Sequence, residues 1–238
     1  MRMQRVLLAI PAFNEEETLE NVVSNCREHF PGADLLVVND GSTDSTVNVL
    51  NYLGVNYISL PYNLGVGGAI RAAFAYAKNE EYEYLVQIDA DGQHNPTYIK
   101  LLFEHIDNYD VVIGSRFLAN TDYKIENVRK FGILIIRKYL RVLTSNQLSD
   151  PTSGFRLNNK QAIDFFAETY PIEYLGDTVG SIVQGSLHGL KFGECSTPMS
   201  HRQGGKPSQG KLRSLGHLSR TLLTISMMRL RFSRKELN

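Results

Sequence analysis

Short apolar runs alternate with helical patterns through the first half of the chain, and this alternation constrains the fold more than any other feature of the sequence. The apolar runs predict strands over 6–10, 34–39, 55–60, 84–88 and 111–114. The stretches between them predict helices from residue 14, over 44–52, over 66–78 and from residue 96. Strands that alternate with helices build βαβ units. We therefore expect an α/β fold with a mostly parallel sheet flanked by helices.

The first of these helices carries a starting signal. Asn14 is expected to cap it, with Glu17 three residues later in the position of a capping box. Its apolar residues recur at helical spacing and should face the core: Leu19, Val22, Val23 and Cys26.

The second half is less regular. It predicts a basic amphipathic helix over 125–145, a turn-rich loop over 150–156, a helix over 175–187, a Gly-rich loop over 201–210 and a second amphipathic helix over 212–232. The length of 238 residues suits one large domain with an appendage. We expect that domain to span residues 1–206, and residues 207–238 to form a basic amphipathic C-terminal helix that contacts a membrane surface or another copy of the chain.

Charge is divided unevenly along the chain. The whole sequence holds 25 Lys and Arg against 25 Asp and Glu, so its formal net charge is zero. From Met199 onward, nine basic residues stand against Glu236 alone, a net charge of +8. The body before it carries −8. A neutral protein is thus expected to combine an acidic body with a basic tail.

Two widely separated cysteines, Cys26 and Cys195, show no CxxC spacing and are expected to be buried free thiols in a reducing compartment. The first residues turn polar too soon for a signal peptide. No apolar run approaches the roughly 20 residues that cross a bilayer. These features predict a cytoplasmic protein.

The most informative side chains follow the fourth predicted strand. Asp89 and Asp91 are two residues apart, so an extended backbone would aim both carboxylates to one side. Two converging carboxylates repel each other unless a cation lies between them. Mg²⁺ is typically held by one or two carboxylates together with substrate phosphates. The pair therefore predicts a divalent metal site, to which Gln93 could add a neutral oxygen.

Polar clusters also follow the first two predicted strands, at residues 10–15 and 37–44. Asp40 in the second cluster could accept hydrogen bonds from a base or a ribose, or could simply belong to a turn. Ligands of such sheets bind beyond the carboxyl ends of the strands. The three clusters therefore predict one site at one edge of the sheet.

Six motifs occur in a fixed order along the chain: PAFNE, VVNDGSTD, NLGVGGA, DADGQH, GSRF and DPTSGFR. This set resembles the family 2 glycosyltransferases of GT-A fold, above all the dolichol-phosphate mannose synthase type and its bacterial polyprenyl-phosphate relatives. The likeness covers roughly residues 5–206. It implies a Rossmann-like sheet, a nucleotide-diphosphate sugar as donor and inversion at the anomeric carbon.

The resemblance also implies roles for particular residues. The nucleoside pocket would be lined by Pro11, Phe13, Glu15 and Asp40. Mg²⁺ or Mn²⁺ would be held against the donor diphosphate by Asp89, Asp91 and Gln93, with Ala90 and Gly65 beside the donor. The family often has Tyr where Phe13 stands and a second Asp where Asn39 stands, so the base of the donor does not follow from the resemblance.

The Gly-rich turn over 63–69 could instead be a dinucleotide fingerprint, since it follows a strand and opens a helix. Ile70 occupies the third glycine position, and no acidic residue ends the next strand. We therefore expect this turn to pack near the donor, where small residues allow close approach.

Basic residues are expected to complete the site, because a planar guanidinium matches phosphate oxygens. Arg116, Arg129 and Arg156 are candidates to face phosphates, with Ser153 beside them, although each arginine could be a surface charge. Arg202 lies in HRQGGK, which resembles a flexible loop of the family, and would stabilise the departing nucleotide diphosphate.

Asp177 is the candidate general base if the acceptor is a sugar hydroxyl. A phosphate acceptor is already an anion at neutral pH and needs no strong base. Asp177 would then only position the acceptor, or favour a helix N-terminus.

Basic and apolar residues alternate over 124–143 and again in the C-terminal tail. Such amphipathic helices lie in membrane interfaces, with about 1 kcal/mol gained per basic residue near anionic headgroups. They favour a lipid-linked acceptor and a peripheral place at the inner face of the cell membrane. Core packing or a homo-oligomer contact is the alternative. Nucleic-acid binding fits poorly, because no aromatic platform accompanies the basic residues.

Two other functions compete with glycosyl transfer. A sugar-1-phosphate nucleotidyltransferase would need a GxGxR loop near the N-terminus, which residues 11–15 do not provide. A binding module without catalysis is disfavoured by the Asp89 and Asp91 pair and by Arg202.

Overall fold

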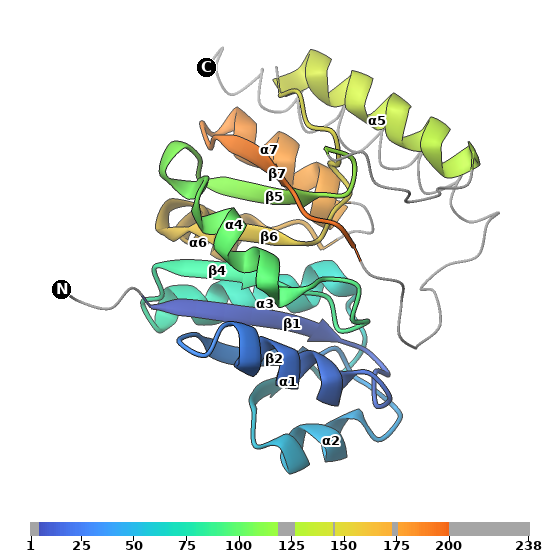
Figure 1. The fold of residues 1–238 in the computed structure, drawn as a ribbon, viewed down its shortest axis with the longest axis vertical. Coiled ribbons are helices and arrows are strands. Elements are labelled where there is room, and N and C mark those ends of the chain that lie inside the picture. Colours follow the sequence, from blue (N-terminus) through green and yellow to red (C-terminus); the bar gives the residue numbers. More distant parts are fainter. Residues whose placement is uncertain (1–4, 119–126, 145, 173–175, 200–238) are drawn as a thin grey trace.

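A computed structural model describes residues 5–118, 127–144, 146–172 and 176–199, with side chains described from residue 132 onward in the second range and from 177 in the last. Its centre is a seven-stranded sheet in the order β3-β2-β1-β4-β6-β5-β7 (Figure 1). The strands span Val6–Ala12 (β1), Asp34–Asn39 (β2), Asn56–Ser59 (β3), Tyr84–Gln87 (β4), Val111–Ser115 (β5), Arg156–Asn159 (β6) and Phe192–Ser196 (β7). Only β6 runs antiparallel to its neighbours.

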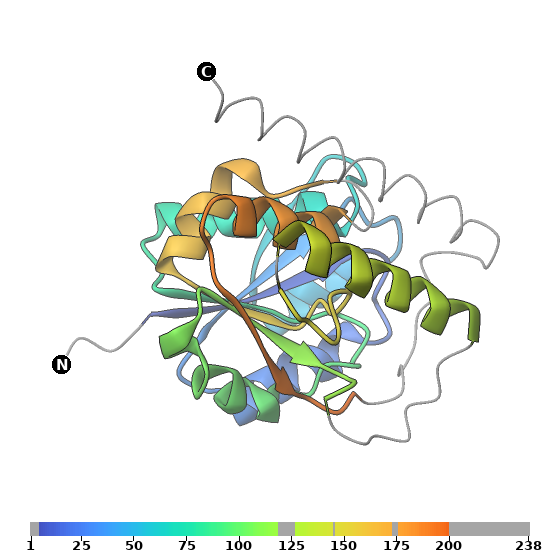
Figure 2. The same cartoon turned by 90° about the horizontal axis from the view of Figure 1, so that it is seen from above.

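Helices cover both faces of the sheet (Figure 2). On one face lie α1 (Leu19–His29), α2 (Thr46–Leu53) and α4 (Ile99–Phe103), and on the other α3 (Val66–Asn79), α5 (Asn127–Thr144), α6 (Lys160–Thr169) and α7 (Ser181–Leu187). Leu7 and Ala9 of β1 join the core under α3, whereas Leu8 and Ile10 join the core under α1. This alternation is what a period of two residues requires. The expected α/β fold is confirmed.

The beginning of α1 is where the prediction of a capping residue was wrong. The helix begins after Thr18, four residues beyond Asn14. Asn14 has φ of 56°, and its Oδ1 accepts a hydrogen bond from the N–H of Thr43, 2.8 Å away. Its side chain therefore joins the loops after β1 and β2 instead of capping the helix. The apolar face was predicted correctly, since Leu19, Val22, Val23 and Cys26 are all buried.

Three elements of the second half were not predicted: β6, α6 and β7. Each strand is only four or five residues long, and β6, with the sequence RLNN, has a single aliphatic residue. The predicted helix over 175–187 is present in two pieces, a π-helical turn over Gly176–Gly180 followed by α7. Two short 3₁₀ turns, Pro96–Tyr98 and Ile106–Asn108, flank α4.

The helix α5 lies at the β7 end of the sheet, beside α7 (Figure 1). Its buried side chains are Ile133, Ile136 and Leu140, one turn apart, while Leu134 and Val142 are 57% and 72% exposed. In the ranges that the structure describes, no helix combines the length and the apolar character that crossing a bilayer requires. The predicted Gly-rich loop over 201–210 and the predicted helix over 212–232 lie outside these ranges.

Candidate active site

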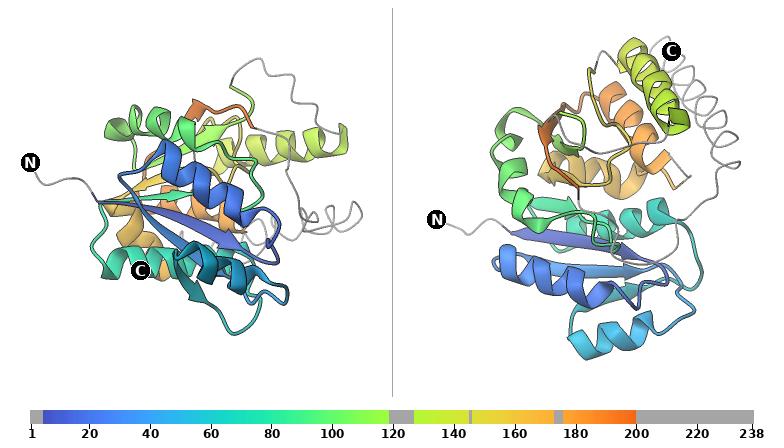
Figure 3. Two further views of the ribbon diagram at one scale, coloured as in Figure 1. Left: turned by 60° about the horizontal axis from the view of Figure 1, so that its bottom comes forward. Right: turned by 45° about the vertical axis from the view of Figure 1, so that its right-hand side comes forward.

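The carboxyl ends of β2, β1 and β4 lie side by side at one edge of the sheet (Figure 3). Ala12, at the end of β1, pairs with Asn39, at the end of β2. The loop after each of these strands carries one of the three predicted polar clusters. The parallel register therefore brings the clusters to a single edge, as the sequence predicts.

The loop after β1 is tied to the loop after β2. The N–H of Asn14 donates to Ser42 Oγ at 2.9 Å, and the N–H of Glu15 donates to Thr46 Oγ1 at 3.0 Å. Glu15 Oε2 also accepts from Thr18 Oγ1 at 2.8 Å. These bonds fix the backbone that carries the predicted nucleoside contacts.

The two other predicted residues of this strand end differ in exposure. Pro11 is buried within β1, where it pairs with Val38. The side chain of Phe13 is 43% exposed, one residue beyond the strand. An exposed aromatic ring at a rigid strand end offers an apolar surface on which a base can stack.

Asp40 holds the Gly-rich turn that follows β3. Its Oδ1 accepts from the N–H of Leu64 and its Oδ2 from the N–H of Gly65, both at 2.8 Å. Burial raises the pKa of this carboxyl, and the two backbone donors act in the opposite direction. Gly65 has φ of 82°, which favours glycine. The turn is therefore fixed by a charge-assisted clamp.

Gly67, within this turn, closes the approach of α3 to the segment after α6. A Cβ at Gly67 would lie 2.6 Å from the carbonyl oxygen of Pro171 and 2.9 Å from the Cα of Ile172. At Gly67, a small residue is therefore required by the close approach of protein backbone.

Asp89 and Asp91 follow β4 in a tight turn. The side chain of Asp89 is 37% exposed, and its Oδ2 lies 3.6 Å from His94 Nε2. Asp91 is buried, and its Oδ1 accepts from the N–H of Gln93 at 3.0 Å. Ala90 between them is buried. The turn is completed by Gly92, whose φ is 74°.

These residues have the donor chemistry that a hard divalent cation needs. Both carboxylates supply oxygen ligands, and Mg²⁺ characteristically binds through one or two carboxylates plus phosphates and water. Among the described residues, no group of three or more His, Cys, Asp or Glu side chains could enclose a metal. The arrangement therefore fits a cation completed by a substrate diphosphate, and it does not fit a closed structural metal site.

Arg116 forms a buried ion pair with Asp150 at the end of β5. Its Nε donates to Asp150 Oδ2 at 2.6 Å and its Nη2 to Asp150 Oδ1 at 2.7 Å. Nη2 also donates to Thr152 Oγ1 at 2.9 Å. The N–H groups of Ser149 and Asp150 donate in turn to Glu194 of β7. Arg116, predicted to face a phosphate, thus anchors the loop over 149–155.

Arg156 is fully enclosed by protein acceptors. It donates to the carbonyl oxygens of Ser153, Pro151 and Thr178 at 2.8, 3.0 and 3.1 Å, and to Ser181 Oγ at 2.9 Å. Burial lowers its pKa from the ordinary arginine value. The guanidinium therefore braces the turn around Asp177, and Ser153, also buried, supports it through its carbonyl oxygen.

Asp177 is the second residue of the π-helical turn and is buried. Burial raises its pKa to about 6, against the opposing effects of the Arg156 charge and of backbone N–H donors. The negative charge of Asp89 raises the pKa of Asp177 further, so this pKa depends on the charge of a predicted metal ligand. Arg202 and the side chain of Arg129, which lies on α5, fall outside the described residues.

Several residues of the site had no predicted role. His94 stands inside DADGQH, and Gly154 stands inside DPTSGFR, where a Cβ would lie 3.1 Å from both carboxylate oxygens of Asp89. Tyr170 is fully buried, and burial raises its pKa. His94 and Gly154 belong to motifs that the sequence identifies, but only the fold shows that Gly154 lies against Asp89.

Comparison with known proteins places this site in a family. Residues 8–166 match the model of glycosyl transferase family 2. The chain is 33% identical over 162 residues to an undecaprenyl-phosphate mannosyltransferase of Micrococcus luteus, which covers 64% of this chain and 65% of the relative. It is 30% identical over 172 residues to a polyprenol monophosphomannose synthase of Mycolicibacterium smegmatis, which covers 68% and 64%. The chain thus spans just under two thirds of the length of these relatives.

The fold has close structural counterparts. A crystal structure of glucosyl-3-phosphoglycerate synthase from Mycobacterium tuberculosis, in complex with Mn²⁺, UDP and phosphoglyceric acid, superposes with a TM-score of 0.71. The match covers 95% of this chain and 78% of that one at 19% identity. The matched family region contains Asp40, Asp89, Asp91 and Arg116, and the chain belongs to glycosyl transferase family 2.

Proposed function

We propose that this chain transfers a sugar from a nucleotide diphosphate donor to a polyprenyl phosphate, with a divalent cation and with inversion at the anomeric carbon. The observation that carries the proposal is the accessible carboxylate of Asp89 beside Asp91, at the strand edge that also holds Phe13 and Asp40. The named activities of the two relatives, on undecaprenyl phosphate and on a polyprenol, support the choice of acceptor.

The donor site is built from the first two strand ends. Phe13 offers the base an apolar face, and Glu15 is held near it by a hydrogen bond that its carboxylate accepts from Thr18 and one that its N–H donates to Thr46. The clamp of Asp40 on Gly65 keeps the Gly-rich turn close to the same edge. A rigid site loses little freedom when the donor binds, which favours affinity.

Negative charge grows on the nucleotide diphosphate as it leaves the sugar. Asp89 and Asp91, with Gln93, would hold Mg²⁺ or Mn²⁺, which neutralises the diphosphate as the glycosidic bond to the sugar breaks. Arg202 would add a second positive charge. The Mn²⁺ and UDP bound in the Mycobacterium tuberculosis neighbour support this assignment.

Two kinds of acceptor would use Asp177 in different ways. Its raised pKa of about 6 leaves it ionised for the most part at pH 7, so it could accept a proton. A polyprenyl phosphate is already nucleophilic at that pH and needs Asp177 only for orientation, with Arg129 near the acceptor phosphate. Transfer to a sugar hydroxyl of a glycolipid or polysaccharide is the alternative, with Asp177 as general base.

A place at the inner face of the cell membrane follows from this acceptor. On α5, the exposed Leu134 and Val142 share the solvent side with exposed Lys138 and Arg141. Apolar and basic side chains together favour an anionic membrane surface. The basic residues of the C-terminal tail would add to the attraction.

The decisive experiment incubates the full chain and Mn²⁺ with UDP-, GDP- or dTDP-sugars and a polyprenyl phosphate in detergent, and analyses the lipid product by mass spectrometry. We expect one donor to give a glycosylated lipid phosphate, with EDTA abolishing transfer. Asp177→Asn should lower the rate modestly with a phosphate acceptor, and almost completely with a hydroxyl acceptor. Transfer that continues in EDTA, or no transfer from any donor, would overturn the proposal.

A further inference from the structure

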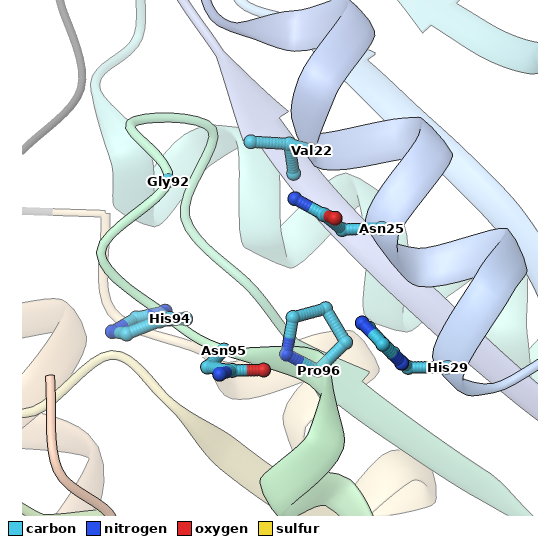
Figure 4. A pocket seen from close by; sticks show the side chains of 7 residues that line it. All are labelled: Val22, Asn25, His29, Gly92, His94, Asn95 and Pro96. Carbon is cyan, nitrogen blue, oxygen red and sulfur yellow. The ribbon is translucent and has the colours of Figure 1, made fainter. Parts of the chain in front are cut away.

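His94 lies in the loop that carries Asp89 and Asp91, and it is one of the residues that line the pocket in Figure 4. Its side chain is 1% exposed and stacks on Phe155, with ring centroids 5.1 Å apart and planes 23° from parallel. A polar ring buried to this degree must find hydrogen-bond partners. The partners of its two nitrogens therefore indicate what the ring does.

Both nitrogens face Asp89. Nδ1 accepts a hydrogen bond from the backbone N–H of Asp89 at 2.9 Å, and Nε2 lies 3.6 Å from Asp89 Oδ2. A nitrogen that accepts a hydrogen bond carries no proton, so the neutral ring holds its proton on Nε2. One side chain thus holds the backbone of Asp89 by a hydrogen bond and lies next to the carboxylate of the same residue.

The Asp89 carboxylate also lies close to Gly154, where a Cβ would lie 3.1 Å from both oxygens. Asp89 is therefore in contact with both the ring of His94 and the backbone of the loop that follows Asp150. Phe155, the next residue of that loop, supports the ring. These two contacts limit the directions that the carboxylate can take.

The loop has less support from α1. A cavity of about 120 Å³ separates the two, lined by Gly92, His94, Asn95 and Pro96 of the loop and by Val22, Asn25 and His29 of α1 (Figure 4). Packing against α1 is therefore interrupted along this stretch. The contacts of His94 with Asp89 and Phe155 therefore contribute more to holding the loop in place than they would if the loop packed on α1.

We propose that His94 is a positioning residue that aims the Asp89 carboxylate at the divalent cation. The inference rests on the metal site of the proposed function and adds a residue that does not itself touch the metal. Groups that orient metal ligands typically affect metal affinity by about 10- to 100-fold. The same restraint should keep the carboxylate ready before the donor arrives.

Two variants separate the contributions of the ring. His94→Phe keeps an aromatic ring to stack on Phe155 but removes both nitrogens. His94→Asn places an amide oxygen near the position of Nδ1, so that it can accept the backbone N–H of Asp89, but it loses the group that faces the carboxylate. Asp89→Asn serves as the control that removes the ligand itself.

Binding of Mn²⁺ alone is measured by electron paramagnetic resonance, and folding by thermal unfolding in EDTA. We expect His94→Phe to weaken Mn²⁺ binding by about tenfold or more, and His94→Asn to retain more affinity than His94→Phe. Wild-type affinity in a folded His94→Phe variant would overturn this inference alone. Absence of Mn²⁺ binding to the wild type would overturn the metal site as well.

The tautomer gives a test that needs no substitution. Nitrogen NMR of the metal-free wild type at pH 7.5 should show His94 unprotonated at Nδ1 and protonated at Nε2. A ring protonated at Nδ1 could not accept the N–H of Asp89 and would contradict the proposal, even if His94→Phe proved unable to fold.

Discussion

Arg116 and Asp150 form a two-pronged ion pair inside the protein, with Nε–Oδ2 and Nη2–Oδ1 distances of 2.6 and 2.7 Å. The side chain of Asp150 is fully buried and that of Arg116 almost so. The pair joins the end of β5 to the loop that carries Gly154 and leads into β6, so the geometry around Asp89 depends on it.

Breaking this pair from one side should be costly. Asp150→Asn leaves the Arg116 charge buried without its counter-charge, and the expected loss of stability is about 3–5 kcal/mol. Asp164→Asn is the matched control, because Asp164 pairs with Lys160 at 2.7 Å on the exposed face of α6 and should change stability by about 0.5 kcal/mol or less. Urea unfolding followed by circular dichroism compares the two. Equal effects would show that the buried pair does not anchor the loop.

Asp40→Asn should loosen the Gly-rich turn. An amide can accept from only one of the N–H groups of Leu64 and Gly65, and its own NH₂ group would face the other. We expect a loss of about 1–3 kcal/mol in stability and weaker nucleotide binding. Calorimetric titration with UDP and GDP measures the second effect. Asp107→Asn is the control, because Asp107 is exposed in the 3₁₀ turn that precedes β5. It should change neither stability nor nucleotide binding.

Gly154→Ala should disturb Asp89 without disturbing the fold. The added methyl group would lie 3.1 Å from both carboxylate oxygens and 3.2 Å from Gln87 Nε2, so these side chains must shift. We expect Mn²⁺ affinity to fall by about tenfold with only a small change in melting temperature. Gly32→Ala is the control, since nothing lies within 4 Å of its new methyl group. If both variants bind Mn²⁺ equally well, the Asp89 carboxylate is not confined as described.

Asp177 should make stability depend on pH. Its pKa rises from 3.8 to about 6 on folding, chiefly because burial disfavours the charged form. The folded state therefore holds the proton more tightly, and this contribution to stability is lost as the pH rises from about 4 to about 6. Asp177→Asn avoids the buried charge and should be more stable than the wild type by about 2–3 kcal/mol at pH 7.5.

The measurement is thermal unfolding of both proteins in EDTA between pH 4 and 8. The difference should be small near pH 4, where the wild-type carboxyl is protonated in the folded state and only about half ionised in the unfolded state. A wild type that is the more stable protein at pH 7.5 would contradict the expected cost of the charge. The same variant should nevertheless transfer sugar more slowly, since its side chain can no longer orient or deprotonate an acceptor.

The first half of the fold could be predicted because each element carries its own pattern. β1 and β2 are continuous apolar runs, and α3 follows an unbroken helical period, so local preference and burial agree. β6 was missed because the run RLNN is polar on its own and becomes a strand only between β4 and β5, where antiparallel partners complete its hydrogen bonds. The prediction that Asn14 caps α1 failed for a related reason. Its side chain has the chemistry of a helix cap, but in the fold it accepts a hydrogen bond from the N–H of Thr43, which lies far away in the chain.

The sequence by itself determined the α/β architecture, the sheet edge at which the polar clusters gather and the Asp89 and Asp91 pair, because these depend on periodicity and on residue type at strand ends. Only the tertiary structure decided which charges are available to a ligand. Arg116, Arg156 and Asp40 look alike in sequence as candidate contacts, yet each is hydrogen-bonded to protein atoms that include residues far away in the chain. Whether a charged group meets protein or ligand depends on burial and on distant partners, and a linear pattern contains neither.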